Sequence, residues 1–436
     1  MRALLLILIA SSALGQGRFD RFNQRTDQGR STRGFEQSSY AFFEFAPASG
    51  AGMGTACACT TPTGAKGEAL TFTRAGDATC SKQGLATTGI ANGDLVVCTV
   101  NQPRVESSGG VLGLRVEGAR TNVLPRFINP CDAAWADVGT PALTGQVVSG
   151  TACATTTPQA SPWSGTYANA AVQFDDNDGA AFEGRTQTVT VSAATAYTMS
   201  CFVKAGTLAS ATVSLDGTTA NITGLSSTTW SILSVTDASS SGVAIAAQVL
   251  NGSTAAATGT VVWGGCQVEA GAHFTSMIPT VAGAATRNAD DAYIDLPPAT
   301  LGDFSVAGTA WTPSTAAVRR LHGAFTKAPD DGSNFVATYQ DTGTLFGQFV
   351  SGAGSSTWNT ALATATTVRA ASFISGGTVG ACINGTCATQ AIGTFNPALI
   401  THPRRLRIGA YATTNGNIDG VATLVCFQPD SPTRCR

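Results

Sequence analysis

The sequence is short of charge, and of lysine in particular. Charged residues make up 12% of its 436 positions, and the formal net charge is −2. Arginine carries most of the positive charge, because lysine occurs only as Lys66, Lys82, Lys204 and Lys327. So neutral a chain has no broad basic field, and we expect no nucleic-acid partner. The hydrophobic fraction of 43% is enough for packed cores, so the low charge does not indicate disorder.

Sequence signatures of catalysis are also missing. The chain has no nucleophile elbow, zinc-protease motif, phosphate-binding loop or dinucleotide motif, and only three histidines. A pair of carboxylates, as in glycosidases, is the remaining enzymatic option. The glutamates considered for it are Glu44, Glu68, Glu106, Glu117, Glu183 and Glu269. We interpret Glu117 and Glu269 as structural, with Arg120 and Arg287 as ion-pair partners, and we expect no enzyme.

Long apolar runs are absent after the N-terminus, which predicts no membrane span. The N-terminus itself has Arg2, an apolar run over 3–10 and small residues over 11–15. This pattern predicts a signal peptide over 1–15, with a buried strand as the alternative. Residues 16–37 are polar and Arg-rich, typical of a solvated leader or of an arm that docks on an acidic partner.

The chain has twelve cysteines, an even number without a CxxC pair or neighbouring histidines. In an exported chain this favours disulfides over a zinc site. Proximity in sequence suggests three pairs: Cys131 with Cys153, Cys382 with Cys387, and Cys426 with Cys435. Cys201 and Cys266 lie in strand-like runs of one module and are candidates to link its two sheets. The first four cysteines, Cys57, Cys59, Cys80 and Cys98, are expected to pair among themselves.

Short Thr- and Val-rich runs separated by Gly, Ser and Asp predict an all-β chain. We expect a small N-terminal β region over 38–128 and a β-sandwich over 129–290. A second sandwich over 291–436 completes the expected tandem of jelly-roll type. In the middle region, strand-like runs recur about every 10 to 15 residues, the spacing of a sandwich.

Several motifs are too specific for generic β-structure. The run VVWGGCQVEAG over 261–271 is a buried strand that ends in a glycine turn, and FTSMIPT and TRNAD follow at 274–280 and 286–290. Upstream lie LTFTRAGDAT at 70–79, NQPRV at 101–105 and LRVEGARTNVL at 114–124.

Together these motifs resemble a carbohydrate-binding-module-like β-sandwich family of phage tail and tail-fibre proteins and of bacterial secreted proteins, with Met277 where that family has Tyr. They cover about residues 69–290. Further on, residues 406–411 and 417–427 resemble the end of a concanavalin-like or laminin-G-like domain. The resemblance implies a binding module.

Two kinds of side chain are candidates for ligand contact. Sugars stack on exposed aromatic rings, and Trp163 and Trp358 lie in loop-like or polar surroundings. The acidic run Asp175, Asp176, Asn177 and Asp178 precedes Gly179 and could wrap Ca²⁺, although a solvated turn is the plainer interpretation. No other cofactor is expected.

The sequence therefore favours a non-catalytic binding protein, secreted or at a cell surface, whose partner is a glycan or a cell-surface polymer. One alternative is a structural phage tail or fibre component within a virion, where a homo-oligomer such as a trimer would be expected. The other is a polysaccharide-degrading enzyme. The signal peptide argues for the exported use of these modules over the virion, because tail proteins assemble in the cytoplasm.

Overall fold

A computed structural model describes residues 41–44, 70–81, 88–108, 111–127, 131–145 and 159–296, and then mainly the strands between residues 304 and 429. Apart from one short 3-10 helix, η1 (Gly165–Tyr167), all regular elements in these ranges are strands. The predicted all-β class is confirmed. The expected signal peptide and leader, residues 1–37, lie outside the described residues. No helix in the described ranges is long and apolar enough to cross a membrane.

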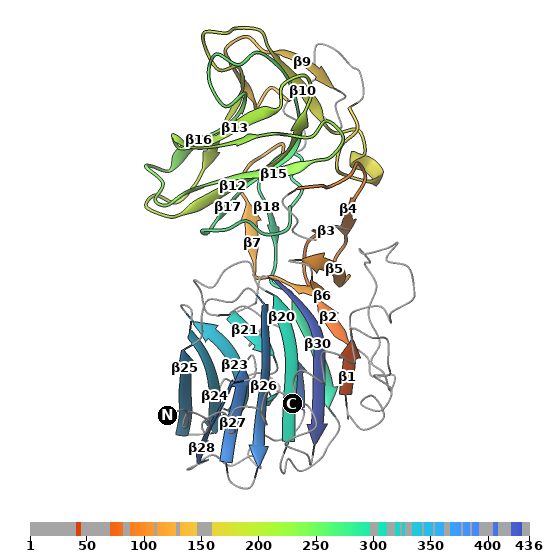
Figure 1. Cartoon of the computed structure of the whole chain (residues 1–436), viewed down its shortest axis with the longest axis vertical. Coiled ribbons are helices and arrows are strands. Elements are labelled where there is room, and N and C mark those ends of the chain that lie inside the picture. The colour runs from red at the N-terminus through yellow and green to blue at the C-terminus, as the bar shows by residue number, and fades with distance from the viewer. Residues whose placement is uncertain are drawn as a thin grey trace, which may run out of the picture.

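The middle of the chain forms a sandwich of two five-stranded antiparallel sheets, the upper lobe in Figure 1. The first sheet has the order β15 (Ser231–Asp237), β12 (Tyr197–Ala205), β17 (Gly259–Ala270), β10 (Val172–Asp176) and β9 (Ala142–Gly145). The second has the order β14 (Thr218–Thr223), β13 (Ser210–Leu215), β16 (Ala244–Asn251), β11 (Gly184–Thr190) and β8 (Ala136–Val138).

The core of this sandwich follows from two-residue periodicity. In β15, Leu233 and Val235 are buried, while Ile232, Ser234 and Thr236, which alternate with them, are partly exposed. Trp263 of β17 is fully buried in the same core, and its ring lies 6.3 Å from that of Phe174. Apolar side chains of both sheets thus meet between them, as the alternating sequence pattern predicts.

β17 is the longest strand of the sandwich, and it contains a glycine, Gly264, where other side chains pack closely against the strand. A Cβ on Gly264 would lie 2.6 Å from Cδ of Pro162 and 2.9 Å from the ring of Trp230. Gly264 therefore lets a second layer of aromatic side chains approach the strand. The pairing of β12 with β17 shifts register at this point, between Cys201 and Val203. The strand ends before Gly271, whose φ of +126° marks the expected glycine turn.

The lower lobe in Figure 1 contains the C-terminal strands. Its largest sheet has the order β28 (Thr386–Ala391), β27 (Thr378–Ile383), β26 (Thr367–Ser375), β20 (Phe304–Trp311), β30 (Gly420–Pro429), β6 (Val111–Val116) and β5 (Arg104–Ser108), with β1 (Ala41–Glu44) also on β30. Two four-stranded sheets accompany it. They are β2 (Thr71–Thr73), β19 (Asp291–Leu296), β29 (Arg404–Arg407), β22 (Phe325–Lys327), and β21 (Arg319–His322), β23 (Asn334–Asp341), β24 (Thr344–Ser351), β25 (Gly354–Ala361).

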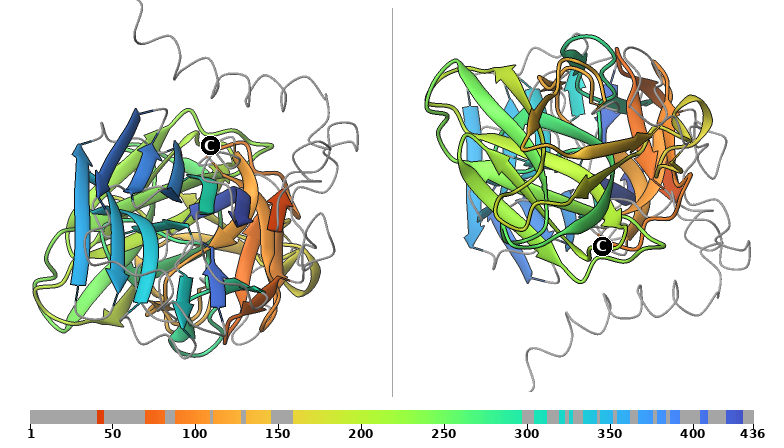
Figure 2. Two further views of the ribbon diagram at one scale, coloured as in Figure 1. Left: turned by 90° about the horizontal axis from the view of Figure 1, so that it is seen from below. Right: turned by 90° about the horizontal axis from the view of Figure 1, so that it is seen from above.

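The N-terminal strands pair with strands from the C-terminal part of the chain. β1 and β6 pair with β30, and β2 pairs with β19. Figures 1 and 2 show these strands along one side of the lower lobe. The reason is that the edge of a sheet needs a partner strand, and here a segment over 300 residues distant in sequence supplies it. Local sequence carries no signal for such a pairing.

The two lobes are joined by a junction that the chain crosses twice. β7 (Arg120–Asn122) leads into the sandwich and pairs with β18 (Ala285–Arg287), which leads out of it. Beside them, β3 (Ala78–Ser81) and β4 (Leu95–Cys98) form a small two-stranded sheet. This small sheet lies against the first sheet of the sandwich: Ile90 bridges to Trp230, and Leu95 to Trp163.

Candidate functional site

Trp163 is a core residue, so the prediction that its ring is exposed for sugar stacking is wrong. Its side chain is fully buried, and its indole Nε1 donates to the carbonyl of Gly264 at 2.8 Å. The ring packs edge-on against Phe127 and Phe202, with centroids 5.2 and 6.0 Å away. The Ser-Pro context that suggested a loop instead places this ring over the glycine of β17. Trp358 lies in β25 opposite Gly347, and its side chain is outside the described residues.

The acidic run after β10 folds back on its own backbone. Asp176 is buried and accepts hydrogen bonds from the amides of Asp178 and Glu183, both at 3.2 Å. Glu183 in turn accepts from the amide of Asn177 at 2.8 Å. Within the described residues, no group of three or more His, Cys, Asp or Glu side chains is placed to hold a metal ion. These contacts are those of a hydrogen-bonded turn, and Asp175 belongs to the strand before it.

The disulfide between Cys201 and Cys266 is present. It joins neighbouring strands β12 and β17 of one sheet, with Cα atoms 4.1 Å apart, so it does not link the two sheets as expected. Cys131 is also in a disulfide, but its expected partner Cys153 lies outside the described residues, as does Cys435. Cys382 and Cys387 face each other across the β27–β28 hairpin, the register that their predicted pairing requires, and Cys426 lies in β30.

The sequence motifs converge on one buried cluster at the junction, which we call the junction network. Its members come from strands or turns far apart in sequence, and each lies within or directly next to one of the motifs named above. They are Arg74, Arg104, Glu106, Arg115, Glu117, Glu269, Arg287 and Asp290, all 2% exposed or less. Arg74, Arg104, Arg115 and Asp290 were not singled out from the sequence, and Glu106 was considered only as a candidate catalytic carboxylate. The only available signal was that each stands within or next to a motif.

Glu117 is the centre of the junction network. Its carboxylate lies 2.7 Å from Nη1 of Arg104 and 2.8 Å from Nη1 of Arg287, and it accepts the amide of Ser276 at 2.9 Å. Burial alone would raise the pKa of Glu117, but Arg287, Arg104 and Arg115 hold it well below its usual value. Arg287, one of the two arginines expected as ion-pair partners, pairs with Glu117, and this carboxylate stays ionised.

Asp290 pairs with two arginines of the junction network, Arg104 and Arg74. It lies 2.6 Å from Nη2 of Arg104 and 3.3 Å from Nη1 of Arg74, and it accepts the backbone amide of Glu117 at 2.9 Å. Arg74 also donates to the carbonyls of Cys98 and Thr99. Desolvation, followed by repulsion from Arg104, lowers the pKa of Arg74 to about 10, so it remains a cation at neutral pH.

Glu269 is held differently from the other three carboxylates. It accepts hydrogen bonds from the backbone amide and the hydroxyl of Thr275, the latter at 2.8 Å, and from Gln267. Burial raises its pKa to about 7, against the opposing influence of Arg287. Near neutral pH the Glu269 carboxyl is therefore partly protonated, whereas Glu117 is fully ionised.

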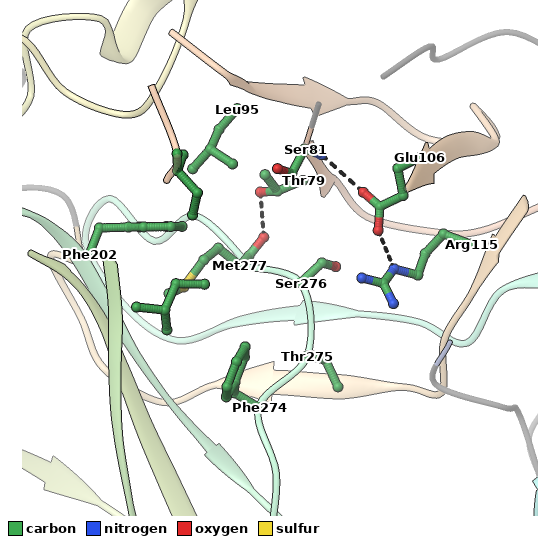
Figure 3. A pocket seen from close by; sticks show the side chains of 12 residues that line it. Thr79, Ser81, Leu95, Glu106, Arg115, Phe202, Phe274, Thr275, Ser276 and Met277 are labelled. Carbon is green, nitrogen blue, oxygen red and sulfur yellow. Dashed lines mark hydrogen bonds and ion pairs between the residues drawn. The ribbon is translucent and has the colours of Figure 1, made fainter. Parts of the chain in front are cut away.

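A small pocket lies beside the junction network (Figure 3). Residues of strands and turns line the pocket, including Thr79, Ser81, Glu106, Arg115, Phe202 and Phe274. Glu106 accepts the amide of Ser81 at 2.9 Å and pairs with Nε of Arg115. The terminal nitrogens of Arg115 are buried, and among the residues that the structure describes none forms a hydrogen bond with them.

The two outer faces of the sandwich differ. The face of the sheet with β12 and β17 is covered by a second apolar cluster, in which Phe202 and Val262 pack against Ile90, Leu95 and Met277. Its tryptophans are fully buried, and Lys204 lies over Trp230 with Nζ 4.6 Å from the ring centre. No sugar-stacking ring is exposed on the part of this face that the structure describes.

The outer face of the sheet β14–β13–β16–β11 is open at many positions. Its outward side chains alternate with the core residues and carry hydroxyl or amide groups without charge. The exposed or partly exposed ones are Thr186, Thr188, Thr190, Thr219, Asn221, Thr223 and Gln248, with Ala244 and Ala246 between them, whereas the outward Ser210, Thr212, Ser214 and Leu250 are buried. The register sets Thr186, Gln248, Ser214 and Thr219 in one row across four strands, in which Ser214 is only 4% exposed. We call this surface the hydroxyl face.

No protein-family model matches the sequence, and no curated protein matches it either. Among solved structures, the chain is similar to the CBM40 module of the Ruminococcus gnavus IT-sialidase bound to α2,3-sialyllactose, with 14% identity over 30% of this chain and 77% of that chain, and a TM-score of 0.27. It is also similar to the CBM2 module of the evolved Dit of Lactobacillus casei BL23 phage J-1, with 12% identity over 32% and 69% and a TM-score of 0.23.

A third similar structure is the tandem CBM22 domain of Paenibacillus barcinonensis Xyn10C, with 10% identity over 74% of this chain and all of that chain, and a TM-score of 0.24. These likenesses are distant. The chemistry of the site rests on the residues of this chain.

Proposed function

We propose that this protein is an exported, non-catalytic binding protein that adheres to a neutral glycan on a cell surface through the hydroxyl face. The observation that carries the proposal is the contrast between the two sheet faces. One is covered by Trp163, Trp230 and their neighbours, while the other presents hydroxyl and amide groups at regular strand spacing. Such groups both donate and accept hydrogen bonds, as sugar hydroxyls do.

The absence of charge on the hydroxyl face suits a neutral polymer. Its outward positions on β11, β13, β14 and β16 contain no Asp, Glu, Lys or Arg. Neighbouring strands lie about 4.8 Å apart, so the accessible members of the row, Thr186, Gln248 and Thr219, offer an extended chain more than one contact. Contacts of this kind are individually weak and act together, which fits adhesion better than capture of a single small molecule.

Export is supported by the cysteine pattern and by the disulfide between Cys201 and Cys266, since such bonds persist outside the reducing cytosol. The lack of catalysis is supported by how the carboxylates are used. Glu117 pairs with arginines, and Glu183 accepts backbone amides. Neither is offered to a substrate.

A glycan array, with whole-cell binding beside it, tests the proposal. Binding to one or more neutral glycans is expected, with the same result in calcium and in EDTA. Thr188→Lys and Asn221→Lys place long cations on the exposed hydroxyl face and should weaken binding at least tenfold. Ala284→Lys introduces the same long cation at an exposed position outside the sandwich sheets and should leave binding intact.

If the protein binds neither the glycan array nor whole cells with calcium present, the result contradicts adhesion. Loss of binding in EDTA alone would instead restore the calcium interpretation of Asp175, Asp176, Asn177 and Asp178. New reducing ends after incubation with a glycan panel would show an enzyme. Trimers or filaments in electron microscopy, without glycan binding, would favour a structural component of a virion.

A further inference from the structure

The edge strand β14 is long for an edge and well exposed. It is the last strand of its sheet, and among the residues that the structure describes no strand pairs with its outer side. Four of its six residues are exposed, and the other two, Ala220 and Ile222, pack against the sandwich core. A strand in this position presents unpaired backbone amides and carbonyls to solvent, where another chain can pair with them.

The turn between β13 and β14 fixes the hydrogen-bonding pattern of the edge. It consists of two residues, Asp216 and Gly217, with φ angles of +52° and +83°. Positive φ at both positions defines a type I′ turn, so the flanking residues Leu215 and Thr218 exchange backbone hydrogen bonds. Hydrogen bonds to the two neighbouring strands alternate along a strand. Accordingly, the amide of Asp216 donates to Ala246 on the opposite side of β13.

The same alternation shows which backbone groups of β14 face outward. Counting in steps of two from the turn, Ala220 and Ile222 direct their amides and carbonyls to β13. Thr219, Asn221 and Thr223 therefore direct theirs away from the sheet. The side chains of these three residues also point outward from the core, so the open edge borders the hydroxyl face.

β14 carries none of the features that usually protect a sheet edge, which are a charge, a proline or a bulge. Its sequence TTANIT has no Asp, Glu, Lys, Arg or Pro, and its pairing with β13 shows no register shift. The other edges of the sandwich differ. β8 carries the exposed Asp137, β15 has no exposed residue, and β9 has only four residues. Of these edges, β14 is the most suited to accept another strand.

The sequence of β14 is complementary to itself in one antiparallel register. If Asn221 lies opposite Asn221 of a second copy, Thr219 lies opposite Thr223 and Ala220 opposite Ile222. Apolar side chains then meet on the core side and polar ones on the outer side. A shift of one residue would set core-facing side chains against outward ones. In this register the three outward-directed backbone positions of each copy meet one another, and no like charges are opposed.

We propose that two copies of this chain associate through β14, paired antiparallel about a two-fold axis at Asn221. Both open edges are used in such a contact, so the assembly closes as a dimer. The two sheets become one continuous sheet, and their hydroxyl faces lie side by side. The contact needs no glycan and is independent of the proposed function, although a polymer that reaches both faces would bind more tightly to the dimer.

Sedimentation velocity of the full chain, without glycan and over a range of concentrations, is the first test. A reversible equilibrium between monomer and dimer is expected, because the contact is one strand pair and small for an interface. A monomer at every concentration up to the limit of solubility would overturn the proposal. Assembly into trimers would also overturn it, since a pair of strand edges closes at two copies.

Opposite charges at Asn221 test the register. Asn221→Lys and Asn221→Asp each set like charges face to face across the axis, so each variant alone should be monomeric. An equimolar mixture should dimerise again, because the introduced cation then faces the introduced carboxylate. The side chain of Asn221 is exposed, and circular dichroism checks that both variants fold. Dimers in the separate variants, or monomers in the mixture, would contradict pairing at Asn221.

Amide hydrogen exchange reads the contact at the strand itself. The amides of Thr219, Asn221 and Thr223 should exchange more slowly at high protein concentration than at low. Those of Ala220 and Ile222, already bonded to β13, should change little. Protection that does not depend on concentration at the first three amides would argue against the dimer.

Thr188→Lys separates the dimer from glycan binding. Thr188 lies on β11, away from the β14 edge, so this variant should bind glycan more weakly and still dimerise. A native chain that dimerises and binds no glycan would support the β14 contact and contradict the proposed function. A chain that binds glycan only as a monomer would do the reverse.

Discussion

At the scale of single residues, Glu117 is the most informative position. Taken alone, it reads as a carboxylate next to a glycine turn, equally suited to catalysis or to structure. In the fold it contacts two arginines and the amide of Ser276, and no exposed surface remains. A buried carboxylate with this many partners positions the backbone around it and is unavailable to a substrate.

Replacing Glu117 by Gln should destabilise the protein by about 3–5 kcal/mol, because Arg104 and Arg287 would be left as buried, poorly compensated cations. Urea unfolding of the two proteins measures the difference. The matched control is Asp137→Asn, whose partner Arg185 is buried but whose own side chain is 55% exposed. That change should cost at most about 1 kcal/mol. Equal losses in the two variants would contradict the central role of Glu117.

Glu269 gives the protein a pH dependence with a definite sign. Its folded pKa of about 7 lies above the reference of 4.5, so between these values the folded state retains a proton that the unfolded chain has released. The free energy of unfolding should therefore fall by about 3 kcal/mol as the pH rises from about 4.5 to about 7. Glu117 acts in the other direction, because its lowered pKa removes stability as the pH drops below 4.5.

Chemical unfolding across pH 4 to 8 tests this behaviour, with greatest stability expected near pH 5. In Glu269→Gln the decline between pH 4.5 and 7 should disappear. The exposed Asp216→Asn, whose carboxylate is already held ionised by Ser241, should retain it. If the Glu269→Gln protein still loses stability over that range, another group is responsible.

At the scale of elements, β17 shows how one strand serves two cores. One side carries Trp263 and Val268 into the sandwich, while on the other side Val262 lies under Trp163. Gly264 is the point of closest approach to this second layer. Its role was visible in the sequence only as a glycine in a conspicuous motif, because nothing local shows that Pro162 and Trp230 pack there.

Gly264→Ala should cost about 1–3 kcal/mol, because the new methyl group would overlap Pro162 and Trp230, both held in a packed layer. The midpoint of urea unfolding, together with near-ultraviolet circular dichroism of the tryptophans, measures the effect. Gly242→Ala is the matched change at a site with no heavy atom within 4 Å of the added Cβ. It should be neutral or slightly stabilising, and a comparable loss at both sites would rule out overlap as the cause.

At the scale of the whole molecule, the sandwich depends on segments outside its sequence boundaries. Phe202 and Ile232 on its first sheet are covered by Ile90, Leu95 and their neighbours. The same N-terminal segment also supplies strands to the lower lobe. The junction therefore packs against both lobes, and neither lobe has a complete apolar surface without it.

A fragment of residues 129–290, the sandwich as bounded by its sequence, should aggregate or bind ANS strongly, because it exposes the apolar face around Phe202 and Val262. A fragment of residues 70–296 retains the cover and the junction network, and it should stay soluble with native-like tryptophan signals. Size-exclusion chromatography and ANS fluorescence compare the two. Equal solubility and ANS binding would contradict the structural role given to the cover.

Much of the architecture was predictable, and the site largely was not. The strand-like runs that recur every 10 to 15 residues in the middle region predicted a sandwich, and β12, β13 and β15 are among the strands that form there. The burial of Trp163 was missed because a tryptophan in a Ser-Pro context has the same local sequence whether or not a distant strand covers it. Calcium stayed an open alternative to a solvated turn for the acidic run, because sequence cannot show that backbone amides occupy its carboxylates.

The sequence by itself determined the β-class and the positions of the motifs, since periodicity and turn residues act over a few neighbours. Only the tertiary structure decided that these motifs meet in one buried network, that the N-terminal strands complete the lower lobe, and that one sheet face is covered while the other stays open. Such outcomes depend on contacts between residues a hundred or more positions apart. No local pattern encodes them.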